Sequence, residues 1–387
     1  MNTFGVKKTM TARMLKGTAL LSGMFVVQLA TAQVPDLLNA LDTGGRAMGV
    51  GGATSTTDAS PQSALDNPAG LAYVKSPTTT LVLRNLPKST TTIGGTFTDR
   101  SLSTRAGSGR TALSHFGYAM PYRKGTLGFS YTIGGFIDDL SGAANLPNGA
   151  TSIRNLREER KAQTDFFTFS YGESRGSVNY GFGIVVANQY TKFSQQYQVF
   201  DAGNQQVGST NTTASDNGIG VGLVVGAQGS VGNGGSQTWG ASVRTPINIQ
   251  NNTDTAGIYD QIPGKLSVGT AGRLDQFARG SDFLVWGAEV DYYFGGQGNK
   301  VFARDNYFGF GLGVEYSYHR GDDRFPIRLG YQYSPSGGDG FSDRNALTFG
   351  LGYRPANRPY SVDLSFARPS MGSRFDFALG VTYRPTK

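Results

Sequence analysis

The sequence predicts an all-β protein: a 14-stranded antiparallel transmembrane β-barrel with an N-terminal hatch, or plug, folded into its lumen. Three observations predict this class. An export signal opens the chain, long segments of alternating apolar and small or polar residues follow, and short and long connections alternate between those segments. Glycine makes up 56 of 387 residues, about twice the usual share. Cysteine is absent, so packing and hydrogen bonds alone must hold the fold together.

Residues 1–32 have the pattern of a cleaved secretory signal peptide. Four basic residues and no acid precede an apolar run at 19–29, and Ala30-Thr31-Ala32 provides small residues for cleavage. The basic residues are Lys7, Lys8, Arg13 and Lys16. The apolar run is interrupted and shorter than the roughly 20 residues of a membrane helix. Removing these four charges lowers the net charge from +8 by four to +4, and no basic cluster with interleaved aromatics indicates a nucleic-acid partner.

Residues 33–77 are the predicted hatch, because a glycine-rich segment without catalytic groups lies between the signal and the first strand. Its central part, residues 46–71, reads RAMGVGGATSTTDASPQSALDNPAGL. Gly49, Gly51 and Gly52 allow close backbone packing in a narrow lumen, and a second interpretation makes them hinges for a moving hatch. No Gly-Lys-Ser/Thr follows them, so they are not a phosphate loop.

Residues 78–387 are the predicted barrel. Phe308, Phe310 and Leu312 alternate with glycines, and Phe377, Leu379 and similar apolar residues alternate near the end of the chain. A soluble sandwich also alternates, but here the polar face combines glycine with charge and the strands approach ten residues, as expected for a wet lumen and a tilted bilayer crossing. The predicted strands are 78–98 (interrupted at Leu86-Pro87), 112–122, 125–136, 164–173, 177–193, 217–229, 236–246, 263–274, 282–294, 306–319, 325–334, 345–354, 360–368 and 373–384.

Loop lengths give the orientation, because outer-membrane barrels keep short turns on the periplasmic side and long loops outside. The long loops are predicted at 99–111, 137–163, 194–216, 247–262, 295–305 and 335–344. Both termini are then periplasmic. The charged run RNLREERK, residues 154–161, falls in an external loop and is interpreted as a short surface helix, with a receptor site as the alternative.

The hatch resembles that of the FadL/TodX family of outer-membrane transporters for long-chain fatty acids and aromatic hydrocarbons. The residues that carry the resemblance are Gly45, Ala47, Gly49, Gly51, Gly52 and Ala53, then Asp58, Ala59 and Ser60, then Asn67-Pro68-Ala69-Gly70, with PGKLSVG at 263–269 and IRLGYQY at 327–333 as weaker matches. The resemblance implies a fourteen-stranded barrel whose hatch closes the lumen, with apolar ligands caught outside, passed inward and released through a gap in the wall.

Two features depart from this family. The predicted loops 137–163 and 194–216 are polar, with glutamines such as Gln195 and Gln205, whereas fatty-acid carriers have apolar external loops. The last residue is Lys387, so the usual terminal aromatic assembly signal is displaced to Tyr383. A related branch with similar hallmarks serves protein secretion and surface attachment, which stays open as an alternative function.

Charged residues of the hatch and wall are candidates for contact with each other or with a ligand. Arg46, Asp58 and Asp66 of the hatch can pair with the wall charges that alternation directs inward, which seats the plug. Those wall charges are Arg244, Lys265, Arg273, Glu289, Asp291, Glu315, Arg328, Asp363 and Asp376. A sharper hypothesis is that Arg244, Arg273 and Arg328 bind a ligand carboxylate, since the guanidinium fork suits that group.

Strand irregularities suggest a place for the gap. Pro121, Gly94-Gly95 and Leu86-Pro87 each weaken the hydrogen-bonded ladder near the first strands. They are either ordinary strand ends and bulges or a lateral opening for an apolar cargo.

Catalysis is not expected. The two histidines are His115 and His319; Ser114 beside His115 points to the opposite side of its strand, and His319 with Glu315 points into the lumen. An outer-membrane lipase or acyltransferase is the enzymatic alternative. We expect no enzyme activity, no cofactor and no metal.

The sequence therefore predicts a passive outer-membrane transporter for hydrophobic small molecules, in contact with outer-membrane lipids. The hatch or gating residues are Arg46, Gly49, Gly51, Gly52, Asp58, Asn67, Pro68, Ala69 and Gly70. The alternative is a docking or accessory barrel for secretion or surface attachment. The cargo, and whether the barrel works as a monomer, stay open.

Overall fold

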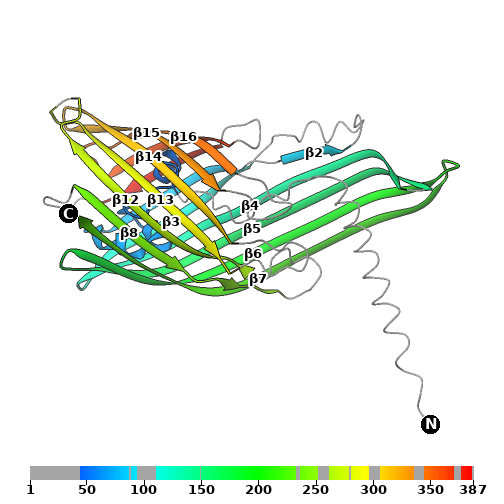
Figure 1. The fold of residues 1–387 in the computed structure, drawn as a ribbon, viewed down its shortest axis with the longest axis horizontal. Helices are drawn as coiled ribbons and strands as arrows, with labels where there is room; N and C mark the ends of the chain where they lie inside the picture. The colour runs from blue at the N-terminus through cyan, green and yellow to red at the C-terminus, as the bar shows by residue number, and fades with distance from the viewer. Residues whose placement is uncertain are drawn as a thin grey trace, which may run out of the picture.

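The structure is a computed structural model. It describes residues 44–86, 89–93, 110–148, 150–231, 236–251, 261–278, 280–295, 306–334, 344–369 and 376–385. Within these residues, fourteen strands form a closed antiparallel barrel (Figure 1). The prediction of an even barrel of fourteen strands is confirmed, and the predicted signal peptide lies outside the described residues.

The barrel strands follow one another around the wall in chain order. They are β1 (Thr78–Leu86), β3 (Arg110–Tyr122), β4 (Gly125–Asn148), β5 (Thr151–Arg175), β6 (Val178–Asp201), β7 (Gln206–Val231), β8 (Gln237–Arg244), β12 (Gly264–Asp275), β13 (Phe283–Phe294), β14 (Tyr307–Arg320), β15 (Asp323–Ser334), β16 (Arg344–Tyr353), β17 (Tyr360–Pro369) and β18 (Asp376–Tyr383). The ring closes where β1 pairs with β18, for example Leu81 opposite Val381.

The wall is apolar outside and small or polar inside. Along β14, Phe308 is 59% exposed and Leu312 47% exposed, whereas Gly309 and Gly311 between them are buried. Many apolar side chains of this kind face outward around the barrel, which only a lipid environment accommodates. The predicted alternation is thus that of a transmembrane barrel. No helix among the described residues is long and apolar enough to cross a membrane.

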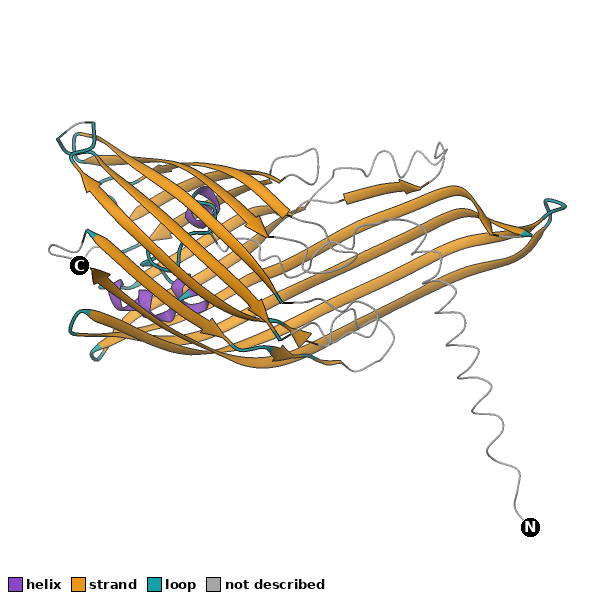
Figure 2. Cartoon of the chain, viewed as in Figure 1, coloured by secondary structure: helices purple, strands orange, loops and turns teal. Residues whose placement is uncertain are grey.

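Residues 44–77, here called the inner segment, lie inside the barrel near the end that carries the short turns (Figure 2). The segment contains two short helices, α2 (Gly45–Gly49) and α3 (Ser63–Asp66), and the 3-10 helix η1 (Pro68–Tyr73). Helix α2 contacts β15 to β18, whereas α3 and η1 contact β4 to β6 and η1 also reaches β7. The segment therefore lies between opposite parts of the wall.

Four strands extend far beyond the rest of the barrel (Figure 1). Strands β4 to β7 are 24 to 26 residues long. Their outer parts, which extend beyond the barrel, form a four-stranded sheet that is here called the projection. The predicted external loops 137–163 and 194–216 are therefore wrong: their residues continue the ladders, with Asn148 opposite Thr151 and Val199 opposite Gly208. Residues 206–215 are mostly polar, rich in serine and threonine, and give no apolar alternation to detect.

The predicted surface helix at residues 154–161 is also wrong, because these residues belong to β5. Glu159 and Lys161, two residues apart, share one face of the strand and form an ion pair of 2.9 Å. A bulge interrupts the ladder with β6 between Arg154 and Arg157, where Asn155 has a positive φ of 54°. The charged run is thus strand with a local irregularity.

The first predicted strand does not continue as one barrel strand. Residues 78–86 form β1, but β2 (Ser89–Ile93) leaves the wall and pairs in parallel with residues 139–143 of β4. Near this point the β3–β4 ladder ends at His115 opposite Thr132, although both strands continue. The described wall therefore has an unpaired stretch between residues 110–114 of β3 and the part of β4 that follows Thr132.

Short strands in the described part of residues 245–262 lie beside β7 or pair with each other. They are β9 (Ile247–Asn248), β10 (Gln250–Asn251) and β11 (Gln261–Ile262). Ile247 and Ile262 are fully buried in an apolar cluster with Leu65 of the inner segment and Phe166 and Val224 of the wall. The predicted loop 247–262 thus contributes to the interior of the barrel.

Candidate functional site

The inner segment is irregular, so the wall must supply partners for many of its backbone groups. Glu289 accepts hydrogen bonds from the backbone amides of Thr54 and Ser55, at 2.9 and 2.8 Å. Hydroxyls of the wall donate to its carbonyls: Ser170 to Ala64 (2.7 Å), Thr126 to Val74 (2.9 Å), Ser242 to Asp66 (2.7 Å) and Thr348 to Gly49 (3.3 Å). Gln228 donates to Thr56 and Ser365 to Gly45. Buried backbone groups are costly without such partners.

The Asn67-Pro68-Ala69-Gly70 turn is held by its own asparagine and by the wall. The Asn67 side-chain oxygen caps η1 by accepting from the amide of Ala69 at 3.2 Å, and its nitrogen donates to Ser55 and Ala227 carbonyls. Pro68 occupies the first turn of η1, where its missing N–H costs nothing. A Cβ at Gly70 would lie 2.6 Å from the Asp58 carbonyl oxygen, so glycine is required there by space.

Gly51 brings the inner segment into backbone contact with the wall. It has a positive φ of 63°, and a Cβ there would lie 2.6 Å from the Tyr331 carbonyl oxygen and 2.7 Å from that of Leu312. On the wall side, a Cβ at Gly313 would lie 2.7 Å from the Val50 Cβ. The glycines on the inner face of β14 and β15 therefore exist to let the segment approach, which supports the close-packing interpretation.

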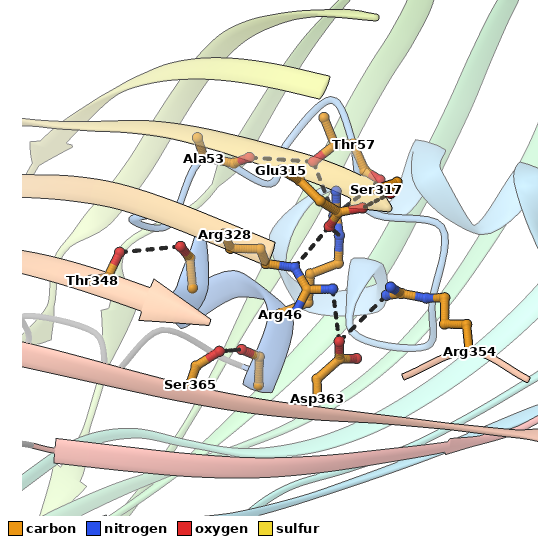
Figure 3. A network of polar contacts seen from close by, with 12 residues as sticks. Arg46, Ala53, Thr57, Glu315, Ser317, Arg328, Thr348, Arg354, Asp363 and Ser365 are labelled. Atoms are coloured by element: carbon orange, nitrogen blue, oxygen red, sulfur yellow. Dashed lines mark hydrogen bonds and ion pairs between the residues drawn. The ribbon is translucent and has the colours of Figure 1, made fainter. Parts of the chain in front are cut away.

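A chain of ion pairs joins the inner segment to β14, β15 and β17 (Figure 3). Glu315 accepts from Arg46 of the segment at 3.0 Å and from Arg328 at 2.8 Å. Arg328 also reaches Asp363 at 2.7 Å, and Arg354 approaches the same oxygen at 3.5 Å. Arg46 donates further to the Thr57 hydroxyl at 3.2 Å. The structure thus brings Arg46 and Arg328 together at one carboxylate.

A second charged cluster lies on β12 and β13. Lys265 lies 2.9 Å from Asp291 and 3.9 Å from Glu289, the residue that binds the inner segment's amides. On β1, the buried Arg84 lies 3.6 Å from Asp376 of β18, across the seam that closes the barrel. Each inward charge in these groups has an opposite charge beside it, as burial requires.

The three arginines predicted for a ligand carboxylate do not gather at one place. Arg328 is fully buried in the network with Glu315. Arg244 donates to the Pro263 carbonyl at 3.3 Å and lies over the ring of Phe166. Arg273 pairs with Asp275 at 2.6 Å. The β12 residue opposite Arg244 is Lys265, and Arg273 lies eight residues further along the strand, which is roughly 26 Å at 3.3 Å per residue. A single carboxylate cannot reach all three.

A polar cavity of about 210 Å³ lies between the inner segment and the wall at the short-turn end. Its lining includes Arg46 and Asp58 of the segment and Arg324, Arg354 and Arg384 of the wall. Burial raises the pKa of Asp58, while Arg46 nearby acts against this rise. Arg324, Arg354 and Arg384 were not among the site residues predicted from the sequence. Strand parity could have found them, since each shares the inward parity of its strand, as Arg328 shows on β15.

The histidines and Ser114 are engaged with other groups. The Ser114 hydroxyl donates to the Val82 carbonyl at 3.3 Å, and the buried His115 ring lies 2.9 Å from the Thr132 hydroxyl. His319 lies 3.5 Å from Asp282. In the part of the chain that the structure describes, no group of three or more histidine or acidic side chains is arranged to hold a metal ion.

Several solved structures have this fold. A Pseudomonas aeruginosa FadL homologue aligns over 88% of this chain and 98% of its own with a TM-score of 0.54 at 15% identity. The Ralstonia pickettii toluene transporter TbuX aligns over 90% and 99% with a TM-score of 0.60 at 14% identity, and the CymD monoaromatic hydrocarbon channel over 90% and 99% with a TM-score of 0.59 at 12% identity. Neither a protein-family model nor a curated protein matches the sequence. The predicted FadL/TodX resemblance is thus confirmed at the level of the fold.

The first prediction concerns the ion pairs. The change Glu315→Gln leaves the buried Arg328 and the largely buried Arg46 without their shared carboxylate, which costs about 3 kcal/mol or more. We expect hydrogen exchange of the amides at 45–58 to accelerate at least roughly a hundredfold. The control Arg273→Gln breaks a pair whose side chains are 50% and 67% exposed, and it should leave that exchange unchanged. Equal exchange in both variants would contradict the assignment.

The second prediction separates backbone strain from close packing. Gly51 and Gly176 have nearly equal positive φ angles, 63° and 64°, but nothing lies within 4 Å of a Cβ at Gly176. In both Gly51→Ala and Gly176→Ala the alanine must adopt a positive φ, which costs about 1 kcal/mol. Only Gly51→Ala adds a collision with the wall, so it alone should speed exchange in the inner segment. If the amides of residues 45–58 exchange at equal rates in the two variants, the fit of Gly51 to the wall is not what holds the segment.

Proposed function

We propose that this protein is a passive outer-membrane transporter for hydrophobic small molecules such as long-chain fatty acids or aromatic hydrocarbons. The observation that carries the proposal is an apolar break in the wall of a barrel whose lumen holds an inner segment. Neighbours with this fold are named as toluene transporters and monoaromatic hydrocarbon channels. With the short turns toward the periplasm, the projection points away from the cell.

The break between β3 and β4 is lined by apolar side chains. Leu86 is fully buried and Ile133 is 2% exposed, and Ala112, Tyr131 and Phe136 pack against them. A bulge in β4 between Ile133 and Gly135 bends the strand away at this level. Because a hydrophobic molecule gains by leaving water, an apolar break beside lipid is a suitable exit. In this arrangement the side chains fill the break, so passage requires them to move.

The inner segment is the proposed gate. Arg46, Gly49, Gly51 and Asp58 connect it to β14–β17 or line the cavity beside it, and Gly52 bonds within the segment to the Ala47 carbonyl at 3.0 Å. The Asn67-Pro68-Ala69-Gly70 turn fixes its other side to β5–β7. Movement of residues 46–58 alone would open a path, while the Asn67-Pro68-Ala69-Gly70 turn kept the segment anchored. Arg244, Arg273 and Arg328 cannot bind one carboxylate together, so their proposed role is that each contacts the ligand separately.

The third prediction tests the break as the exit. The chain has no cysteine, so Ala112→Cys with Phe136→Cys introduces one pair, and both side chains pack on the same cluster. Joining them with a short bismaleimide should reduce uptake of a labelled long-chain fatty acid and of labelled toluene several-fold, because the strands can no longer separate.

The matched control is Tyr118→Cys with Phe129→Cys, which face each other in the paired part of the same two strands. Crosslinking there should leave uptake as in the untreated protein. Full uptake after crosslinking at 112 and 136 would remove the break from the proposed route.

The projection favours a second candidate function, docking of a partner in secretion or surface attachment. Among the described residues, positions 206–217 of β7 pair with β6 on one side and with no strand on the other. Val207, Asn211 and Thr212 there are exposed, and residues 206–215 carry no charge. Natural edge strands use charges and prolines to avoid new pairing, and residues 206–215 of this edge have neither. Such an edge can accept a partner strand.

The fourth prediction distinguishes the two functions. Ile137 faces Ala162 and Gln189 faces Gly218, so an Asn-Gly turn at each place can replace residues 138–161 and 190–217. The shortened barrel should still fold, as judged by heat-dependent migration on a gel. If transport is the function, its uptake should stay within about twofold of the full protein. A folded variant without uptake would show that the projection is part of the transport route. A folded full-length protein without uptake would favour docking.

A further inference from the structure

We propose that the polar cavity at the short-turn end binds the carboxylate of an organic acid, with Arg324, Arg354 and Arg384 as its ligands. This site lies apart from the break between β3 and β4 and from Arg244. The proposal concerns binding and does not depend on the transport route.

Arginines outnumber carboxyl groups in the lining of the cavity. Four guanidinium groups line it, those of Arg46, Arg324, Arg354 and Arg384, against three carboxyl groups of Asp58, Glu315 and Asp363. Glu315 is already shared by Arg46 and Arg328, and one oxygen of Asp363 by Arg328 and Arg354. These two carboxylates are thus shared among three arginines.

Three arginines of the lining, Arg324, Arg354 and Arg384, have hydrogen-bonding capacity left for a ligand. The Nη1 atom of Arg354 is buried and has no hydrogen-bond partner among the described residues. Neither Arg324 nor Arg384 has a described carboxylate within ion-pair distance, and Asp323 beside Arg324 instead accepts from the Tyr353 hydroxyl and the Ala356 amide. A partly buried cation without a counter-charge is costly, and a bound anion relieves that cost.

The backbone fixes two of these arginines side by side. Arg324 and Arg354 exchange backbone hydrogen bonds of 3.0 and 2.9 Å, so their side chains leave the wall at neighbouring points. Ser361 and Thr382 add hydroxyl donors to the same lining, and Val82 and Gly380 provide a small apolar surface. This combination suits a carboxylate attached to a short carbon chain, because the planar guanidinium fork matches two carboxylate oxygens.

The size of the cavity sets the size of the group. A volume of about 210 Å³ leaves room for a carboxylate with a few carbons. The rest of a longer acid would have to lie outside the cavity. A molecule such as benzoate is therefore a suitable probe, and benzyl alcohol has nearly the same shape without the charge.

The experiment measures binding of benzoate and benzyl alcohol by calorimetry to the full-length protein in a nonionic detergent. The wild type should bind benzoate saturably and at least about tenfold more tightly than benzyl alcohol. The double variant Arg324→Gln/Arg354→Gln should lose this tenfold preference, and Arg384→Gln alone, which changes an exposed residue, should lose part of it. Heat-dependent gel migration confirms that each variant is folded.

The control is Arg175→Gln, which removes an exposed arginine at a short turn of the same end that already has Glu173 as a partner. It should bind benzoate like the wild type. Equal affinity for benzoate and benzyl alcohol, or wild-type benzoate binding in folded Arg384→Gln and in the double variant, would overturn the proposal. Displacement of benzoate by equimolar inorganic phosphate would overturn the assignment to carboxylates. Uptake of toluene, which carries no charge, tests the transport function separately.

Discussion

An irregular peptide inside a membrane barrel must find a partner for nearly every backbone N–H and C=O group, and this constraint shapes the rest of the molecule. The wall meets it in two ways. Hydroxyl, amide and carboxylate side chains of the inner face reach the segment's backbone, as Glu289 does for Thr54 and Ser55. Glycines on β14 and β15 remove the side chains that would otherwise hold the segment away. The glycine content of the chain follows from this fit.

The same constraint places charged pairs at both ends of the barrel. At the short-turn end the inner segment is fixed by ion pairs through Glu315, and the arginine-lined cavity lies beside them. Toward the projection, Phe166, Ile247 and Leu65 pack together and Leu86 packs with Ile133 at the break in the wall. The pairs Arg84–Asp376 and Lys265–Asp291 lie on the same side of the barrel as these apolar clusters.

The barrel itself could be predicted from the sequence because its physics is periodic. Side chains that alternate between lipid and lumen, as at Phe308 and Gly309, mark each strand, and the short turns fix the number of strands. The projection could not be predicted in this way. Its outermost strand is polar, so residues such as Thr210 and Thr212 show no apolar alternation, and nothing in their pattern distinguishes a long hairpin from a polar loop.

The candidate site was only partly predictable for a related reason. The alternation along the strands predicted a set of inward wall charges that could pair with Arg46. In the structure, Arg46 pairs with Glu315 from that set. Which wall charge meets which part of the segment depends on the path of an irregular chain, and no period encodes that path. For the same reason the role of Glu289 as a backbone acceptor, and the grouping of Arg324 with Arg354, needed the structure.

Ion conductance of the reconstituted barrel tests most directly the claim that the inner segment closes the lumen by its fit to the wall. The full-length protein in a planar bilayer should conduct little, whereas a variant without residues 44–77 should form steady open pores of much larger conductance. If the two proteins conduct equally, the segment does not close the lumen and the account of its fit to the wall is wrong.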